Sequence, residues 1–219
     1  MWFGRITPEK GTHLAIEAAR RAGMPLVLAG PISDPQYFAE RVEPELGSEV
    51  RYAGHLGQDA LARVVGSAGA ALVTPTWDEP YGLVIAEAMS CGTPVVAFDR
   101  GGVPELVGPR CGRLVPPNDV AAMARAIPEV LQLSRLVVRR HAKSRCSATA
   151  MLHSYLALYG RLIDDVRNNH DRVLRPSPRL RASGPRDEHR RADASAGHGV
   201  DQSRRARGEP VQRGGAATA

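Results

Sequence analysis

Several residue types are scarce in this chain of 219 residues, and each scarcity argues against a class of protein. The three cysteines form no Cys-x-x-Cys pair, which argues against a disulfide scaffold and predicts reduced thiols and a cytoplasmic location. No apolar run reaches the roughly 18 residues that span a bilayer, and the first residues show no signal-peptide pattern. We therefore expect no transmembrane segment and no export. The histidines show no ligand spacing, so no metal site is expected.

Large apolar residues disappear towards the C-terminus, where aromatic residues stop at Tyr159 and isoleucine at Ile163. Residues 166–219 hold 12 arginines and six acids, whereas residues 1–165 hold 17 basic and 17 acidic residues, so the net charge of +6 belongs to the tail. Such a segment cannot offset the entropy of ordering, and we expect a disordered Arg-rich tail. Clustered arginines suit nucleic acid or an anionic membrane. The interrupting acids and missing aromatics favour a solvated extension with no nucleic-acid partner.

Two periodicities alternate within residues 1–165. Short apolar runs cover residues 1–5, 25–29, 49–53, 70–74, 94–98 and 112–115. Helical patterns lie between them, at residues 14–19, 37–46, 59–68, 83–90 and 120–131. Strands separated by helices imply right-handed βαβ units and a parallel sheet covered on both faces. The expected fold class is α/β, a doubly wound parallel sheet (Rossmann-like) in one domain over residues 1–165.

Two closing helices are expected after the last strand, at residues 135–143 and 147–166. The second carries Leu152, Tyr155, Leu156, Tyr159 and Ile163 at helical spacing. This stripe predicts a face that packs against the core.

Polar residues and glycines follow the ends of several expected strands. Arg5 and Lys10 follow the first strand, Gly54 and His55 the third, Glu79 and Gly82 the fourth, and Gly101 and Gly102 the fifth. Ligands bind at the carboxyl ends of the strands in such a sheet. These segments, distant in sequence, therefore predict one shared site.

The segment from Asp78 to Ala88 places two carboxylates, Glu79 and Glu87, eight positions apart around a Pro-Tyr-Gly turn. Helical residues at this spacing lie only about 80° apart around the axis and roughly 12 Å along it. One carboxylate can then meet each end of an extended ligand. The first helical N–H groups, after Gly82, would lie between them and attract an anion.

This segment resembles the donor-binding half of the retaining family 4 (group 1) glycosyltransferases, whose E-x7-E signature reads here as Glu79 and Glu87. Further blocks match in the family's order at residues 4–11, 101–105 and 112–119, and a weaker similarity extends the match to about residue 163. The resemblance implies the C-terminal half of a GT-B architecture. It also implies transfer of a hexosyl group from a UDP-, GDP- or ADP-sugar donor to an unknown acceptor, with no cofactor.

The resemblance assigns catalytic roles to Arg5, Lys10 and Glu79. Negative charge grows on the leaving phosphate during transfer, so fixed cations at Arg5 and Lys10 would lower the barrier. Glu79 would hold hydroxyls of the donor sugar and Glu87 those of the ribose, because ionised carboxylates are acceptors. Other donor-binding residues implied are Gly4, Gly54, His55, Tyr81, Gly82, Leu83, Gly101 and Gly102. Of these, the His55 side chain is more simply read as incidental.

Two absent motifs narrow the expected reaction. No Asp-x-Asp sequence is present to anchor a divalent cation, so we expect metal-independent transfer. No Gly-x-Gly-x-x-Gly follows the first strand, which argues against a dinucleotide-dependent oxidoreductase. For retaining members, the resemblance implies that the leaving phosphate helps to deprotonate the acceptor on the same face of the sugar.

Ordinary alternatives remain for each residue: Glu79 could stabilise a helix N-terminus, Arg5 and Lys10 could be solvated, and Glu87 could be an exposed helical residue.

Two functions of the whole chain also remain. The chain would begin at the first strand of the family's second half, so it would be active only in a longer parent or with a partner that supplies the N-terminal, acceptor-binding half. Alternatively, it is a catalytically inactive nucleotide-sugar-binding module or a truncated fragment.

Overall fold

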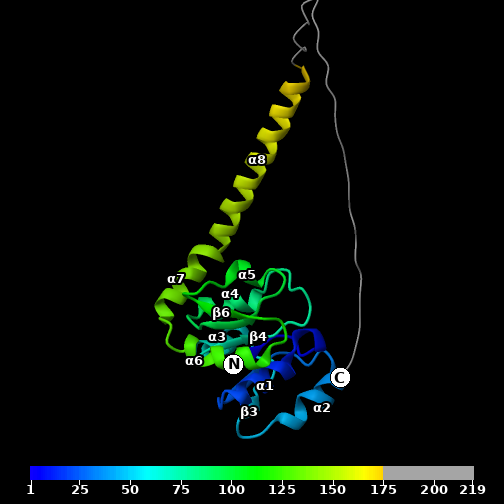
Figure 1. Ribbon diagram of the computed structural model, residues 1–219, viewed down its shortest axis with the longest axis vertical. Coiled ribbons are helices and arrows are strands. Elements are labelled where there is room, and N and C mark those ends of the chain that lie inside the picture. The colour runs from blue at the N-terminus through cyan, green and yellow to red at the C-terminus, as the bar shows by residue number, and fades with distance from the viewer. Residues whose placement is uncertain (175–219) are drawn as a thin grey trace, which may run out of the picture. The chain divides into compact units, whose positions relative to one another are not determined.

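The computed structural model describes residues 1–174 of the chain, with side chains to residue 167 (Figure 1). Its strands are β1 (Trp2–Phe3), β2 (Leu26–Ala29), β3 (Val50–Tyr52), β4 (Ala71–Val73), β5 (Val95–Phe98) and β6 (Gly112–Val115). Its α-helices are α1 (Thr12–Arg21), α2 (Pro35–Arg41), α3 (Gln58–Ser67), α4 (Leu83–Ser90), α5 (Val103–Leu106), α6 (Val120–Val130), α7 (Arg135–Arg145) and α8 (Ala148–Leu174). Two 3-10 helices are η1 (Pro8–Lys10) and η2 (Glu43–Glu45).

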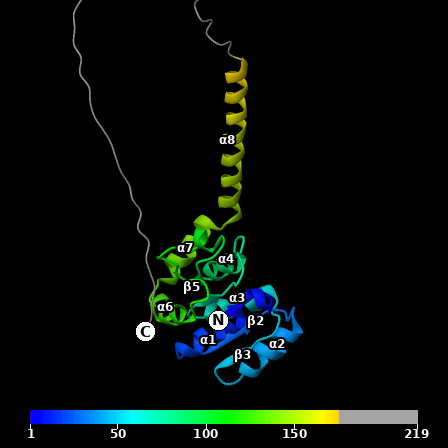
Figure 2. The same cartoon turned by 45° about the vertical axis from the view of Figure 1, so that its right-hand side comes forward.

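Every strand pairing is parallel, in two ladders with the orders β1-β2-β3 and β4-β5-β6. The ladders meet at Met1, whose carbonyl accepts a hydrogen bond from the Leu72 amide at 2.8 Å. The spatial order is therefore β3-β2-β1-β4-β5-β6. Figure 2 agrees, since β3 and α2 lie across the domain from β5 and α6. The doubly wound parallel sheet expected from the alternating patterns is confirmed.

Strand residues point alternately into two apolar clusters, one on each face of the sheet. On one face, Trp2, Leu72 and Val96 join buried residues of α1 and α6. On the other face, Phe3, Val73 and Ala97 join buried residues of α3, α4, α5 and α7. Figure 1 shows α4 and α1 on opposite sides of β4. Burial on both faces explains why the strands read as continuous apolar runs rather than as alternating ones.

Helix starts follow from local capping chemistry. Asp34 accepts a hydrogen bond from the Tyr37 amide at 2.9 Å, and Pro35 occupies the first turn of α2. Asp119 caps α6 in the same way, accepting from the Ala122 amide at 2.8 Å. The helix expected over residues 37–46 instead ends at Arg41, and η2, which contains Pro44, follows it. Pro44 has no backbone N–H with which to extend the hydrogen bonds of α2. The short α5 was not expected.

The expected closing helices are present as α7 and α8, but the prediction that the apolar stripe of α8 packs against the core is wrong. The stripe is exposed: Tyr155 by 51%, Leu156 by 58% and Tyr159 by 54%. Helical spacing shows that a face is apolar, and does not show what covers it. In this domain α7 already closes the core, through Val138 and Ala142.

The domain boundary expected at residue 165 falls inside α8, which continues to Leu174. One compact unit covers Met1–Arg172. Most of the expected Arg-rich tail, residues 175–219, lies outside the described residues. Within the described part, no helix combines the length and the apolar character needed to cross a membrane.

Candidate functional site

A cavity of about 270 Å³ opens at the carboxyl ends of β1 and β4. The strand order reverses here: from β1 the chain proceeds to β2 and β3 on one side, and from β4 to β5 and β6 on the other. Such a reversal leaves a crevice at the strand ends. The cavity is lined by Trp2, Phe3 and Leu72 to Pro75. Four charged side chains also line it: Arg5, Lys10, Glu79 and Glu87. The four come from two segments distant in sequence, the loop after β1 and the loop and helix after β4, as the shared-edge argument predicted.

A second cavity, of about 220 Å³, adjoins the first and shares Gly4, Arg5 and Glu87 with it. Its remaining wall includes Gly30, Pro31, His55 and Leu56, from the loops that follow β2 and β3. Tyr52 holds this wall by donating its hydroxyl hydrogen to the Gly30 carbonyl at 2.7 Å. The two cavities together suit an extended ligand, with Arg5 and Glu87 at their junction.

The loop after β1 is tied to β4 through Thr74. The Thr74 hydroxyl lies 3.1 Å from the Lys10 carbonyl and 2.9 Å from the Gly11 carbonyl, and it accepts a bond from the Trp2 indole at 3.2 Å. Gly11 has φ of +66°, and a Cβ there would lie 2.1 Å from the Thr74 carbonyl oxygen. Only glycine fits this approach. These contacts fix the backbone that carries Lys10 beside the Glu79 loop.

Lys10 and Glu79 form an ion pair inside the first cavity, with 2.5 Å between Nζ and Oε2. The two side chains are 21% and 16% exposed. The indole N–H of Trp77 donates to the same oxygen at 3.2 Å, and the Lys10 ammonium lies 5.2 Å from the centre of the Trp77 ring. The motif spacing does not single out Trp77. The one signal available was an aromatic residue in a polar loop, two positions before Glu79.

The glycine pair packs against the Glu79 loop. A Cβ at Gly101, where φ is +58°, would lie 2.4 Å from the Glu79 carbonyl oxygen. A Cβ at Gly102 would lie 2.2 Å from the Pro80 carbonyl oxygen. The small size of the pair therefore lets two loops meet, whereas the sequence suggested an approach by the sugar or phosphate. Beside this contact, Arg100 and Asp78 form an ion pair, with 3.0 Å between Nε and Oδ1.

Helix α4 carries Leu83 and Glu87 into the site. It begins after Gly82, whose φ of +86° turns the chain into the helix. Leu83 lines the first cavity and Glu87 lines both. Partial burial raises the pKa of Glu87 above its usual value, because removing water from a carboxylate penalises its charged form.

Some expected site residues line neither of these two cavities: Gly54, Tyr81, Gly82, Gly101 and Gly102. The Gly54 carbonyl instead accepts a bond from the Gly30 amide at 2.9 Å. Tyr81 lies beside Cys146, and its pKa is raised by burial first and by the Cys146 thiol second. Their expected contacts with a donor stay predictions. The described residues hold no group of three or more His, Cys, Asp or Glu able to bind a metal ion.

Another cavity, of about 310 Å³, lies at the opposite edge of the sheet. Its lining includes Met1, Met24, Ile127 and Leu131, and no Asp, Glu, Lys or Arg. A binding site combines apolar walls with a few convergent polar groups. The cavities at the carboxyl ends of β1 and β4 add converging charged side chains to their apolar walls, and this third cavity has no Asp, Glu, Lys or Arg in its lining.

Comparison with known proteins agrees with this fold and site. Residues 2–145 match the family model "Glycosyl transferases group 1", so the chain belongs to the group 1 glycosyltransferases. Its Rossmann-like fold matches GT-B glycosyltransferase structures. The resemblance carried by the E-x7-E segment and its neighbouring blocks is thereby confirmed.

Among individual relatives, the D-inositol 3-phosphate glycosyltransferase of Mycolicibacterium smegmatis is 32% identical over 202 residues, covering 87% of this chain and 45% of that protein. The glycogen synthase of Mycobacterium tuberculosis H37Rv is 32% identical over 157 residues, 68% of this chain and 38% of that protein. The chain thus spans less than half the length of these two curated relatives.

Solved structures give the same picture. AviGT4, a glycosyltransferase involved in avilamycin A biosynthesis, has a TM-score of 0.63 and 31% identity, covering 75% of this chain and 51% of that one. Anabaena Alr3699/HepE in complex with UDP-glucose has a TM-score of 0.61 and 25% identity, covering 73% of this chain and 48% of that one.

Proposed function

We propose that this chain is the donor-binding half of a retaining, metal-independent glycosyltransferase that transfers a hexosyl group from a nucleotide sugar. One observation carries the proposal. Arg5, Lys10, Glu79 and Glu87 line the first of two adjoining cavities at the carboxyl ends of β1 and β4, and Arg5 and Glu87 line the second as well. Two cations and two carboxylates along an extended crevice suit a ligand that has a diphosphate between two hydroxyl-bearing sugars.

The diphosphate is placed against Arg5 and Lys10. Arg5 offers a planar fork of donors and Lys10 a compact point charge, which together suit adjacent phosphates. The N-terminus of α4 adds backbone N–H groups and a positive dipole end from Leu83 onward. When the bond between the anomeric carbon and the diphosphate breaks, these groups stabilise the charge that grows on the leaving phosphate.

The two carboxylates act as hydrogen-bond acceptors at the two ends of the donor. Glu79 accepts from hydroxyls of the transferred hexose in the first cavity. Glu87, at the junction of the cavities, accepts from the ribose, and the wall formed by Gly30, His55 and Leu56 holds the base. The acceptor hydroxyl loses its proton to the leaving phosphate as it bonds to the anomeric carbon on the same face. The chain therefore needs no nucleophilic side chain of its own.

The relatives support this proposal. The HepE structure holds UDP-glucose and covers 73% of this chain, and another HepE structure holds UDP. The relatives that match along most of this chain are named as glycosyltransferases or glycogen synthases. Each relative is more than twice as long as the region that matches this chain, and we assign acceptor binding to the N-terminal half of such a protein, on the same chain or on a partner.

A catalytically inactive nucleotide-sugar-binding module is the second candidate, since the matched region covers 45% of the Mycolicibacterium smegmatis relative. Calorimetric titration of the full chain with UDP, GDP and ADP, in buffer with EDTA, tests what the two candidates share. Saturable binding to one base, weakened in Lys10→Ala, supports the donor site. If the chain is folded and binds none of the three diphosphates, the donor site is contradicted.

A mixing experiment then separates the two candidates. The N-terminal half of the Mycolicibacterium smegmatis relative is added to the chain, and consumption of the sugar nucleotide that binds is followed. Transfer or hydrolysis that requires both halves and is lost in Lys10→Ala supports the transferase. Donor binding without turnover supports the module.

A further inference from the structure

Trp77 lies near the site, and the donor-binding roles proposed above do not include it. It lies in the loop between β4 and α4, two positions before Glu79, and is 40% exposed. The backbone next to it is fixed, because the Thr76 amide donates to the Glu9 carbonyl at 2.8 Å. The Gly102 amide donates to the Glu79 carbonyl at 2.7 Å on the other side. The backbone on both sides of Trp77 is therefore held, and its side chain is partly exposed.

Trp77, Lys10 and Glu79 make three mutual contacts. The indole N–H lies 3.2 Å from Oε2 of Glu79. The Lys10 ammonium lies 2.5 Å from the same oxygen and 5.2 Å from the ring centre, within the range of a cation–π interaction. Among the hydrogen bonds of residues 1–167, none goes to Oε1 of Glu79. Both donors thus occupy one carboxylate oxygen and leave the other available.

A diphosphate in the first cavity would change the balance of charges around Glu79. The diphosphate carries more negative charge than one carboxylate, so it competes with Glu79 for the Lys10 ammonium. It also repels Glu79, since like charges in a partly buried site interact strongly. A neutral N–H donor is drawn away much less by the phosphate charge. The Trp77 indole is therefore the contact able to keep Glu79 in place while Lys10 turns to the diphosphate.

We infer that Trp77 is a positioning residue for the donor sugar: its indole N–H holds Oε2 of Glu79 so that Oε1 accepts from a hexose hydroxyl. This inference rests on the proposed function. The competing role for an exposed tryptophan is a flat apolar platform for a sugar ring. Trp77→Phe separates the two roles, because phenylalanine keeps an aromatic ring and its cation–π contact but has no N–H.

The first test compares diphosphates with their sugar conjugates by calorimetry on the full chain. The probe pairs are UDP and UDP-glucose, GDP and GDP-mannose, and ADP and ADP-glucose. For the pair that binds, Trp77→Phe is expected to weaken the sugar conjugate relative to the diphosphate by up to about fivefold, the loss expected for Glu79→Gln, because Trp77 acts through that side chain. The diphosphate itself stays within about twofold. The double variant Trp77→Phe/Glu79→Gln is expected to lose no more affinity for the sugar conjugate than Glu79→Gln alone.

Two outcomes overturn the inference. One is an equal effect of Trp77→Phe on the diphosphate and its sugar conjugate, including no effect on either. The other is a large loss of affinity for the sugar conjugate, relative to the diphosphate, in Trp77→Ala with no such loss in Trp77→Phe. That result would assign Trp77 as an apolar platform for the sugar ring.

The second test needs no ligand. The chain has two tryptophans, so a ¹⁵N spectrum gives two indole signals, and Trp77→Phe assigns them. Glu79→Ala is expected to move the Trp77 signal upfield and to leave the Trp2 signal, whose N–H donates to Thr74. The matched control is Glu87→Ala, which removes the other carboxylate of the cavity and leaves both signals in place. An unmoved Trp77 signal in Glu79→Ala overturns the inference even where a nucleotide binds.

The two tests keep the inference separate from the proposed function. If no diphosphate binds to the folded wild-type chain, the donor-site function fails, and with it the role of Trp77 towards a sugar. If a diphosphate binds and Trp77→Phe behaves as wild type, only the inference fails.

Discussion

The backbone amide of Gly102 donates a hydrogen bond to the carbonyl oxygen of Glu79, with 2.7 Å between the two atoms. This bond joins the loop after β5 to the loop after β4, and it holds the backbone of a carboxylate that lines the first cavity. A Cβ at Gly102 would lie 2.2 Å from the Pro80 carbonyl oxygen, so the two loops meet only because this position has no side chain.

Gly102→Ala is expected to separate these loops. Overpacking of this kind typically lowers the free energy of unfolding by about 1–3 kcal/mol, and displacement of Glu79 should also weaken the sugar nucleotide. Urea unfolding and calorimetry measure the two effects. Gly108→Ala is the matched control, because a Cβ at Gly108 meets no atom within 4 Å. Equal losses in the two variants would contradict the loop contact.

Lys10→Ala is expected to weaken binding of the nucleoside diphosphate itself, by about tenfold or more. The change removes a cation from the cavity and leaves Glu79 without its ion-pair partner beside an anionic ligand. Titration with the bare diphosphate measures the effect. Lys143→Ala, on an exposed position of α7, is the control for loss of one positive charge. Equal affinity of wild type and Lys10→Ala for every diphosphate tested would defeat the phosphate assignment.

Glu79→Gln is expected to spare folding and to reduce discrimination among donor sugars. Glutamine keeps the size of the side chain but replaces an ionised acceptor by a neutral one, which weakens a hydrogen bond from a sugar hydroxyl by about 1 kcal/mol, or about fivefold. The ratio of the dissociation constants for UDP-glucose and UDP-galactose, or for the corresponding pair of another base, measures this. An unchanged ratio with a weakened bare diphosphate would place Glu79 at the phosphate instead.

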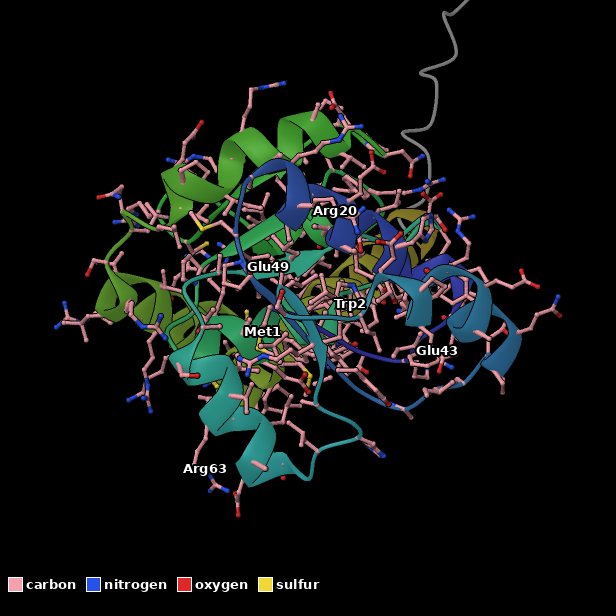
Figure 3. All side chains as sticks on the ribbon, turned by 90° about the horizontal axis from the view of Figure 1, so that it is seen from below. Met1, Trp2, Arg20, Glu43, Glu49 and Arg63 are labelled. Carbon is pink, nitrogen blue, oxygen red and sulfur yellow. The ribbon has the colours of Figure 1, made fainter. Side chains whose placement is uncertain are left out.

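The stability of a chain whose first residue is Met1 should depend on pH through its terminal ammonium. Figure 3 shows Met1 in the interior of the domain, and burial lowers the pKa of this ammonium from 8.0 to about 5. Between these values the unfolded chain binds the proton and the folded chain does not. The free energy of unfolding is therefore highest above pH 8, as far as this group is concerned. It falls as the pH drops from 8 to 5 and stays constant below pH 5. The predicted loss is about 4 kcal/mol.

Urea unfolding across this pH range tests that prediction. The control is the same chain with one added N-terminal residue, which replaces the buried ammonium by an amide. The comparison cancels other groups that titrate in this range, including His13, whose pKa is lowered by burial first. The same pH dependence in both chains would show that the terminal ammonium is not its source.

Leu156→Ala and Leu28→Ala make the same substitution on exposed and buried surfaces. Leu28 is fully buried in β2, so its loss should cost about 2–5 kcal/mol in the free energy of unfolding. Leu156, on α8, is 58% exposed, and its change should cost about 0.5 kcal/mol or less. Urea unfolding compares them. A cost at Leu156 as large as that at Leu28 would mean that the apolar face of α8 is covered in solution.

Much of the fold is legible in the sequence, because strands buried on both faces must be continuous apolar runs. The six expected strands and the parallel arrangement are confirmed, and the doubly wound topology explains why Arg5, Lys10, Glu79 and Glu87 meet. The break in the second helix before Pro44 is a local effect that the pattern of apolar residues does not show. The packing of Gly101 and Gly102 against the Glu79 loop depends on backbone atoms, which leave no periodic signal.

The sequence by itself determined the class of fold, the edge of the sheet that carries the site, and the charged residues that line it, because these depend on spacing along the chain. Only the tertiary structure decided which atoms meet: Trp77 with Glu79, Gly102 with the carbonyl of Pro80, and Met1 with β4. It also left the apolar stripe of α8 exposed. Periodicity describes one face of an element, whereas its partner is decided by every other element that packs around the sheet.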